Sequence, residues 1–313
     1  MIISVTMNPS VDISYRLDEF KLNGVNRVEN VLKTAGGKGL NVARVVHLLN
    51  SPVVATGILG GTIGDFIESQ LQLDGISHDF LKTKQESRNC IAILHGGNQT
   101  EILEAGPTFS KQEEIQFLQH YSKLLEKGEV VTISGSLPKG LEESLYSQMI
   151  LLAKQQQIPV ILDCSEKMMK HVLDFQEARP LAIKPNIDEL NELLDLKISV
   201  DDLEGLRKAI SHPCFNGIEW VLVSLGEKGA FIKYLDEYYI ARIPTVPVVN
   251  PVGSGDSVVA GLAVAILQKK TVENVIKTVM TTGVLNAMET QTGFINSEEF
   301  DFIHNQIEVQ KIM

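Results

Sequence analysis

The sequence predicts a three-layer α/β/α fold with a mainly parallel central sheet and a small β-sheet lid. Short β-branched or apolar runs alternate with stretches of helical periodicity, and runs such as residues 160–162 are apolar without interruption. Such alternation is typical of βαβ units, and uninterrupted apolar strands are typical of a parallel sheet covered on both faces. Two segments that break the alternation predict the lid.

The expected strands and helices follow one another along the whole chain. The expected strands are short and mostly apolar, and they are residues 2–6, 53–57, 90–94, 129–134, 160–163, 182–184, 220–224 and 230–233. The expected helices include residues 39–49, 111–125, 142–156 and 188–196. The sequence contains no internal repeat and no low-complexity segment.

The two interrupting segments have the patterns of extended chain. Residues 8–33 alternate polar and apolar positions, and residues 86–104 form two extended runs joined by Gly96-Gly97-Asn98, a hairpin turn signal. Neither can form a core alone, so they are either surface ribbons or a small sheet that closes over a site and excludes water. We therefore divide the chain into an α/β core of residues 1–7, 34–85 and 106–313 and a β lid of residues 8–33 and 86–105.

Composition excludes several classes of function. The 313 residues include 28 Lys and Arg against 39 Asp and Glu, a net charge of −11. An acidic surface repels phosphate backbones and anionic lipids, so we expect no nucleic-acid partner and no membrane partner. The three cysteines are widely spaced, which favours reduced thiols over a disulfide framework or a zinc site. With neither a signal-peptide pattern nor about 18 consecutive apolar residues, we expect a cytoplasmic protein.

The first of four glycine-rich loops spans residues 35–41 and precedes an expected helix. Glycines let a ligand approach the backbone closely, a helix N-terminus offers free N–H groups to an anion, and Lys38 adds a cation. A tight loop ahead of a helix explains the same residues. The loop lacks the Gly-Lys-Ser/Thr ending of a Walker A loop.

The second and third loops allow structural interpretations as well. Residues 57–65 lack the spacing of a dinucleotide-binding loop, which favours a structural turn or a substrate-side loop over a nicotinamide site. Residues 224–230 are either a plain turn or a contact for a nucleotide phosphate.

The fourth loop, residues 250–257, gives the strongest signal and precedes a small apolar helix. The successive amides of Gly253, Ser254 and Gly255 could form a nest for an oxyanion at the helix start. Asp256 falls in the first turn, where an aspartate can also be only a helix cap.

Five separated motifs, taken together, resemble the ribokinase-like family of sugar kinases. These motifs are Asn8-Pro9-Ser10-Val11-Asp12, Gly36-Gly37-Lys38-Gly39-x-Asn41, Ser134-Gly135-Ser136-Leu137-Pro138, Lys184-Pro185-Asn186-x-x-Glu189 and Gly253-x-Gly255-Asp256. They occur in the family's order, and the resemblance covers essentially the whole chain. Within the family, these motifs together are most similar to the phosphosugar kinase branch, and the stretch from Arg88 to His95 favours tagatose 6-phosphate as the acceptor.

The resemblance implies a reaction and a catalytic group. It implies transfer of the γ-phosphoryl group of ATP, with Mg²⁺, to the 1-hydroxyl of D-tagatose 6-phosphate; the alternative acceptor is the 6-hydroxyl of fructose 1-phosphate. It also implies that Asp256 is the base and that the amides of Gly253, Ser254 and Gly255 form an anion hole. In a loose transition state the hydroxyl proton leaves late, so an ordinary carboxylate pKa is sufficient.

The resemblance also implies where each substrate binds. On the acceptor side we expect the sugar phosphate at Asp12, Gly37, Lys38, Asn41, Arg88 and Asn89, with Lys139 as a third cation for its phosphate. On the donor side we expect ATP at Lys184, Asn186, Ser224, Gly226, Gly229 and Asn286. Asn186 and Glu189 are expected to organise Mg²⁺ largely through water, because Mg²⁺ keeps several waters.

Two further expectations concern partners and rival functions. The exposed edges of a lid sheet invite pairing, so a homodimer through the lid is a hypothesis. A sugar-phosphate sensor that had lost phosphoryl transfer is the rival from another class. Such a sensor would be expected to lack the base or the anion hole, and this sequence has both sets of residues.

Overall fold

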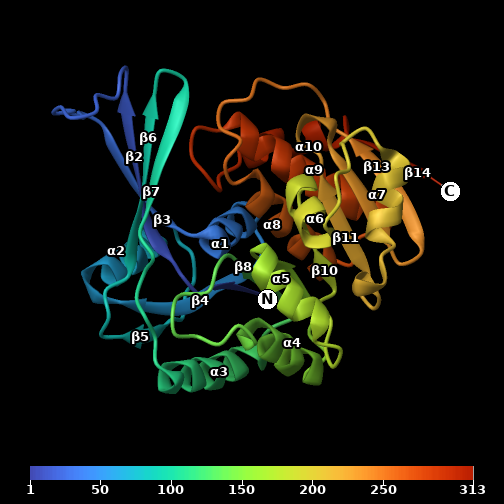
Figure 1. Cartoon of the computed structure of the whole chain (residues 1–313), viewed down its shortest axis with the longest axis horizontal. Coiled ribbons are helices and arrows are strands. Elements are labelled where there is room, and N and C mark those ends of the chain that lie inside the picture. Colours follow the sequence, from blue (N-terminus) through green and yellow to red (C-terminus); the bar gives the residue numbers. More distant parts are fainter. Residues whose placement is uncertain (313) are drawn as a thin grey trace.

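The structure, a computed structural model, describes residues 1–312 and contains two separate β-sheets (Figure 1). The larger sheet has ten strands in the order β14-β13-β12-β11-β10-β9-β8-β1-β4-β5. From β5 to β11 each neighbouring pair is parallel, and from β11 to β14 each pair is antiparallel. Its strands are β1 (Ile2–Thr6), β4 (Val53–Gly60), β5 (Leu81–Thr83), β8 (Val130–Ser134), β9 (Val160–Asp163), β10 (Ala182–Ile183), β11 (Trp220–Ser224), β12 (Ala230–Tyr234), β13 (Glu237–Arg242) and β14 (Glu308–Ile312).

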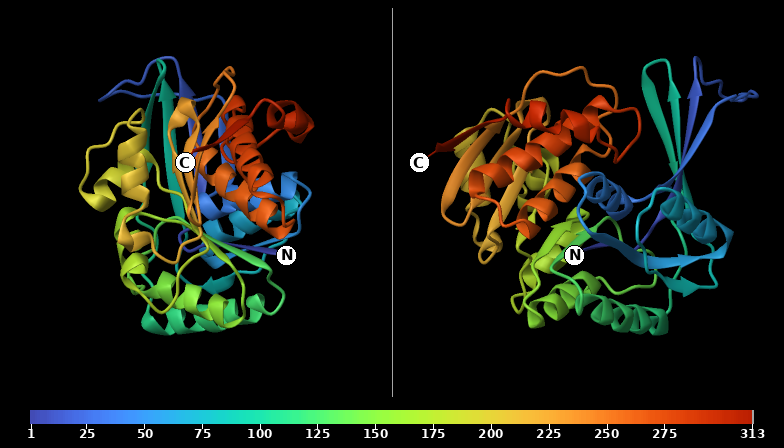
Figure 2. Two further views of the ribbon diagram at one scale, coloured as in Figure 1. Left: turned by 90° about the vertical axis from the view of Figure 1, so that its right-hand side faces the viewer. Right: turned by 180° about the vertical axis from the view of Figure 1, so that it is seen from behind.

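Helices cover both faces of the large sheet, as the left view of Figure 2 shows. One face packs on α1 (Lys38–Leu48), α2 (Gly61–Leu73), α8 (Ser254–Leu267), α9 (Val272–Met288) and α10 (Phe300–His304). The other packs on α3 (Lys111–Leu125), α4 (Leu145–Gln155), α5 (Glu166–Asp174), α6 (Ile187–Leu194) and α7 (Leu203–Ile210). Strands β1, β4, β8 and β9 are buried along their whole length, because each has a helix layer on both sides. The predicted three-layer fold is confirmed.

The smaller sheet rises beside this domain and has the order β3-β2-β6-β7 (Figure 1). Its strands are β2 (Ser10–Leu17), β3 (Val31–Gly36), β6 (Arg88–His95) and β7 (Asn98–Leu103). The predicted hairpin turn is present: His95 pairs with Asn98, and Gly96 and Gly97 both have positive φ, as a tight two-residue turn requires. Strands β2 and β6 pair in parallel although about 80 residues separate Ser10 from Arg88, its partner in the register.

The glycine-rich segment 57–65 was predicted to be a structural turn or a substrate-side loop, and this prediction is wrong. Gly57 to Gly60 complete strand β4, and helix α2 begins directly at Gly61. The physical reason lies in the apolar residues behind the glycines: Ile63, Phe66 and Ile67 follow helical spacing and pack against the core.

Two further observations complete the fold. Among residues 1–312, no helix combines the length and the apolar character needed to cross a membrane. Three short 3₁₀ turns, Pro213–Phe215, Gly226–Lys228 and Ser297–Glu299, connect the larger elements.

Candidate active site

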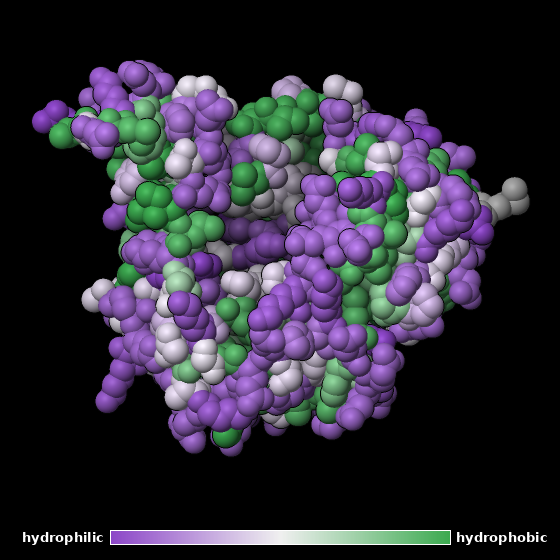
Figure 3. Space-filling view, in the orientation of Figure 1, coloured by the Kyte–Doolittle hydropathy of each residue, from purple (hydrophilic) through white to green (hydrophobic). Residues whose placement is uncertain are grey.

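A cleft of about 1050 Å³ lies between the small sheet and the large one. Its core side is formed where β9, β10 and β11 end, at residues Asp163, Lys184 and Ser224. Ligands of open α/β sheets bind beyond the carboxyl ends of the strands, where the strand order reverses. Figure 3 shows this hollow with strongly hydrophilic residues inside and apolar groups on its margins.

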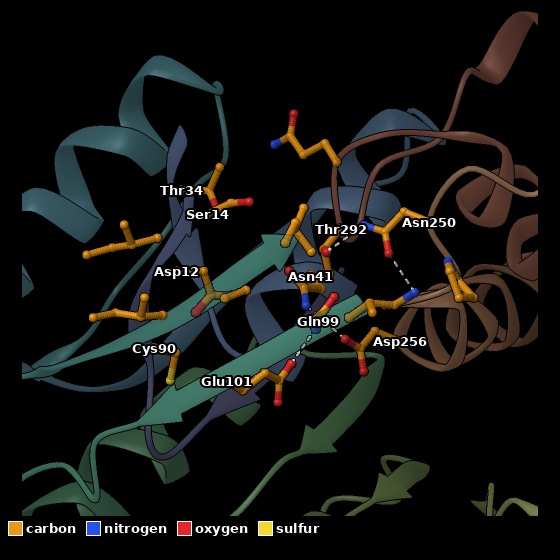
Figure 4. A pocket seen from close by; sticks show the side chains of 18 of the residues that line it. Asp12, Ser14, Thr34, Asn41, Cys90, Gln99, Glu101, Asn250, Asp256 and Thr292 are labelled. Carbon is orange, nitrogen blue, oxygen red and sulfur yellow. Dashed lines mark hydrogen bonds between the residues drawn. The ribbon is translucent and has the colours of Figure 1, made fainter. Parts of the chain in front are cut away.

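Asp256 lies on the core side, in the first turn of α8. Only 6% of the residue is exposed, and its Oδ2 accepts a hydrogen bond of 2.8 Å from Nδ2 of Asn41 (Figure 4). The N-cap residue of α8, Gly253, has φ 87°, and a Cβ there would lie 2.7 Å from the Thr292 side chain. Glycine therefore allows the tight turn that brings the free amides at the start of α8 next to the carboxylate.

The Asp256 carboxyl holds its proton more tightly than an ordinary aspartate. Burial, together with the nearby Asp163 carboxylate, raises the pKa of Asp256 to about 7, although Lys38, Asn41 and Lys184 act in the opposite direction. A raised pKa was not required of the base by the sequence, and the burial of Asp256 adds this feature. A group with a pKa near neutrality is well matched to general base catalysis at neutral pH.

Asp163 is a buried member of the site that the sequence analysis did not identify. Its Oδ2 lies 3.3 Å from Nζ of Lys38, and its Oδ1 lies 3.7 Å from Nζ of Lys184. Burial disfavours the charged form of Lys38, but Asp163, Asp256 and Glu189 outweigh it and raise the pKa of Lys38 above its usual value. A carboxylate at the end of an apolar parallel strand was the signal that could have revealed Asp163.

Lys184 itself lies close to the start of α8. Only 7% of its side chain is exposed, and a Cβ on Gly255 would lie 3.2 Å from its Nζ. Together with Lys38, which also lines the cleft, Lys184 places positive charge beside the free amides of α8. The arrangement is suited to a polyanion such as a chain of phosphates.

The small sheet supplies the other wall, on which Asp12 is the central acidic group (Figure 4). Its Oδ1 accepts a hydrogen bond of 2.7 Å from the Ser10 hydroxyl, and burial raises its pKa. A Cβ on Gly36 would lie 2.0 Å from Cγ of Asp12, so only glycine lets strand β3 pass so close. Gly37 and Arg88 line the same wall.

Arg88, on β6 of the small sheet, makes hydrogen bonds to two backbone carbonyls outside its own strand. Its Nε donates to the Asn8 carbonyl at 3.2 Å, and its Nη1 donates to the Glu104 carbonyl at 3.0 Å. The guanidinium has further N–H groups, and it lines the cleft, so it can also donate to an anionic ligand.

Asn186 and Glu189 line the cleft and also form a capping box on α6. Oδ1 of Asn186 accepts from the Glu189 amide, and Oε2 of Glu189 accepts from the Asn186 amide, both at 2.8 Å. One carboxylate oxygen of Glu189, Oε1, is left for a ligand. Across residues 1–312 no group of three or more His, Cys, Asp and Glu side chains is arranged to hold a metal ion. The oxygen donors fit a Mg²⁺ ion that is held mainly by water and phosphate.

Six residues expected at the site do not line the cleft: Asn89, Lys139, Gly226, Gly229, Ser254 and Asn286. The Asn89 amide groups donate to the carboxylate of Glu104. Asn286 is buried and serves the loop before α8, because its Nδ2 donates to the Val252 carbonyl and its Oδ1 accepts from the Gly293 amide. Gly229 has φ 90° and lies against strand β13. Their binding roles stay predictions.

The cleft also contains polar residues to which the sequence assigned no individual role. Figure 4 shows Ser14, Thr34, Gln99 and Glu101 on the small sheet, and Asn250 and Thr292 beside α8. On β2 and β7, alternation along the strand was the available signal, because every second residue of a strand faces the same side.

Comparisons with known proteins agree with this geometry. A model of the pfkB family of carbohydrate kinases matches residues 5–299. A curated tagatose-6-phosphate kinase from Staphylococcus epidermidis is 51% identical over 312 residues, which cover 100% of both chains. Phosphofructokinase-2 from Escherichia coli, solved in complex with potassium, has a similar fold, with a TM-score of 0.88 and 24% identity over 97% of this chain and 98% of that one. The tetrameric inhibited form of the same enzyme is equally similar, with a TM-score of 0.88 and 23% identity over the same shares.

Proposed function

The chain belongs to the pfkB family of carbohydrate kinases, and on that premise we propose that it phosphorylates D-tagatose 6-phosphate. The reaction transfers the γ-phosphoryl group of ATP to the 1-hydroxyl of the sugar and yields D-tagatose 1,6-bisphosphate and ADP. The observation that carries the choice of substrate is the 51% identity to a tagatose-6-phosphate kinase over both full lengths. The cleft supports this chemistry. Asp12 lies on the wall formed by the small sheet, and Lys38, Lys184 and the amides at the start of α8 lie on the opposite wall.

In this proposal Asp256 is the base. Its Oδ2 is held by Asn41, which leaves Oδ1 to accept the proton of the attacking hydroxyl. A carboxyl group with a pKa of about 7 is a stronger base than an ordinary aspartate, yet it is largely ionised just above neutral pH. The hydroxyl oxygen forms its bond to the γ-phosphorus, and the bond to the β,γ-bridging oxygen of ATP breaks.

The transferring phosphoryl group is held by the first amides of α8. The amides of Gly253 and Gly255, at the start of α8, are the proposed donors to the negative charge that accumulates there. The amide of Ser254 donates to the Pro251 carbonyl at 3.2 Å, so its expected part in the anion hole requires that this bond open. Lys184 and Lys38 flank the same place, and Asp163 holds both ammonium groups in position.

On the acceptor side, Asp12 accepts hydrogen bonds from sugar hydroxyls, while Gly37 and Asn41 line the pocket. Arg88 binds the 6-phosphate, whereas Lys38, which was also expected there, pairs with Asp163 beside Asp256 and is assigned to the transferring phosphoryl group. Asn89 and Lys139 lie outside the cleft, so their contribution requires a movement of the small sheet toward the core. We propose that this sheet acts as a lid and that its closure excludes water from the transfer.

On the donor side, ATP lies along Lys184, Asn186 and Ser224. Mg²⁺ neutralises phosphate charge when it is bound, and Glu189 Oε1 is the protein oxygen available to its water shell. Gly226 and Gly229 shape the turn after β11, and Asn286 holds the loop before α8. We assign these three residues to the nucleotide site only indirectly, through the backbone that they position.

Assembly and location are further parts of the proposal. Val31 and Ile102 of the small sheet are 44% and 53% exposed and lie outside the cleft lining, which supports a homodimer through the lid. A monomeric mass by light scattering at working concentration would contradict it. The cytoplasm is the proposed location, because its reducing conditions suit the three free cysteines and its ATP supplies the donor.

The test is ADP release with Mg-ATP, measured in parallel on D-tagatose 6-phosphate, fructose 6-phosphate and fructose 1-phosphate. We expect the highest kcat/KM on D-tagatose 6-phosphate. A preference for fructose 1-phosphate would keep the base and anion site but overturn the phosphate assignment of Arg88. No turnover of any sugar would favour a sugar-phosphate sensor.

A further inference from the structure

Arg44 lies on α1, beneath the floor of the cleft and outside its lining. Only 4% of its side chain is exposed. Its Nη1 donates to Oδ1 of Asn41 at 3.1 Å and to the Thr292 carbonyl at 3.5 Å, and its Nη2 donates to the Ala35 carbonyl at 2.5 Å. One guanidinium thus joins strand β3, helix α1 and the segment after α9.

The contact with Asn41 determines which way the Asn41 amide faces. A guanidinium has N–H donors and no acceptor, so only the oxygen of the amide can face it. The NH₂ group must then face the other way, toward Asp256, where Nδ2 donates to Oδ2 at 2.8 Å. With the amide reversed, its oxygen would face the carboxylate and would favour the protonated acid.

We propose that Arg44 is a positioning residue for the catalytic base, acting through the fixed amide of Asn41. The inference rests on the proposed role of Asp256 as that base. Arg44 touches neither substrate; it keeps the Asn41 NH₂ group directed at Oδ2, so the ionised form of Asp256 is favoured and Oδ1 stays free for the hydroxyl proton.

The cost of burying Arg44 supports a role beyond packing. Its neighbours Val42, Ala43, Val45 and Val46 on α1 are buried apolar residues, and an apolar side chain would fill this place without the desolvation of a cation. Burial lowers the pKa of Arg44, and Asp74 at the end of α2, whose Oδ2 lies 3.6 Å from Nε, and Asp12 on β2 counteract it.

The charges around Asp256 come from several elements, and the substitution at position 44 leaves them in place. Lys38 on α1 and Lys184 after β10 favour the ionised carboxylate, and Asp163 at the end of β9 disfavours it. A change in the pH dependence after substitution of Arg44 therefore reports on the amide between Arg44 and Asp256.

The experiment compares kcat/KM against pH for the full-length protein and for Arg44→Met and Arg44→Lys, with Mg-ATP and D-tagatose 6-phosphate. The acid limb of such a profile is the fall of kcat/KM at low pH. Met removes every donor, so we expect the pKa of this limb to rise by about one unit in Arg44→Met. At pH values below that pKa, kcat/KM should then be about tenfold lower than in the wild type. Lys keeps an N–H donor for Asn41 and should leave the limb near its wild-type position. An unmoved limb in Arg44→Met would overturn the proposal.

A matched control separates this effect from a loss of stability. Arg179 also donates to backbone carbonyls, those of Val172 and Leu173, but lies far from the cleft in the fold. Arg179→Met should lower the unfolding temperature and leave the acid limb unchanged. A shift of the limb in Arg179→Met equal to that in Arg44→Met would also refute the assignment.

A second variant keeps the test decisive if Arg44→Met does not fold. Asn41→Leu removes the donor to Oδ2 directly and must raise the pKa of the acid limb as well; an unmoved limb would refute the proposal.

Failure of the proposed function can be distinguished from failure of this inference. If the proposed function is wrong, the wild-type protein shows no turnover or no acid limb. If only this inference is wrong, the wild-type acid limb is present and the variants do not move it.

Discussion

The two sheets that face the cleft are built in opposite ways. Strands β1, β4 and β8 of the large sheet are buried at every residue, whereas strand β7 of the small sheet is exposed at every residue. Burial of apolar surface stabilises the large sheet, while the small sheet depends mostly on strand pairing. On the proposed function, this difference would divide the roles of the sheets: the large sheet would hold the reacting groups, and the small sheet would supply the wall for the sugar phosphate.

The largest effect should come from removing the base on the rigid side. Asp256→Asn keeps the shape of the side chain but cannot accept the hydroxyl proton, so we expect kcat to fall roughly 10²–10⁴-fold. Steady-state kinetics measures the fall, and calorimetry should show that ATP still binds. The buried carboxylate is replaced by a neutral amide, so the unfolding temperature should not decrease. Turnover close to that of the wild type would contradict the base assignment.

A pair of isoleucine substitutions tests the difference in stability between the sheets. Ile133 on β8 is fully buried, whereas 53% of Ile102 on β7 is exposed. Ile133→Ala should lower the free energy of unfolding by about 2–5 kcal/mol through lost burial and a cavity. Ile102→Ala should change it by less than about 0.5 kcal/mol. Urea unfolding measures both, and equal losses would show that the two sheets do not differ as their burial indicates.

Substitution on the lid side should mainly affect affinity for the sugar phosphate. Arg88→Ala removes charge-assisted hydrogen bonds worth about 1.5–3 kcal/mol, so we expect the KM for D-tagatose 6-phosphate to rise roughly 10–100-fold. The KM for ATP should change little. Lys33→Ala is the matched control, because Lys33 is an exposed cation of the same sheet outside the cleft. An unchanged sugar KM in Arg88→Ala would remove Arg88 from the phosphate site.

The pH dependence should give the smallest effect. Asp256 acts as base only when ionised, and its pKa is about 7, so kcat/KM should decrease as pH falls through about 7. Below that value the decrease should be about tenfold per pH unit. The fall in kcat/KM is measured with saturating Mg-ATP across about pH 5.5–8.5, a range that brackets the pKa. A flat profile across this range would show that Asp256 is not the titrating base.

Much of the fold followed from the sequence because its signals are local. Strand 160–163 was predicted with the bounds that β9 has, since its uninterrupted apolar residues are buried on both faces. The turn at Gly96-Gly97 was recognised from its residues alone. Helix α2 was missed because the glycines at its start concealed the apolar residues with helical spacing behind them.

The sequence by itself determined the layers of the fold, the glycine-rich turn before α8 and the position of Asp256 within it, because neighbouring residues decide turns, caps and periodicity. Only the tertiary structure placed Asp163 between Lys38 and Lys184, and Arg44 and Asn41 behind Asp256. The Asn41–Asp256 hydrogen bond joins residues 215 positions apart. The pKa of Asp256 depends on burial and on charges that come from α1, the end of β9 and the residue after β10, and no local pattern of residues contains that information.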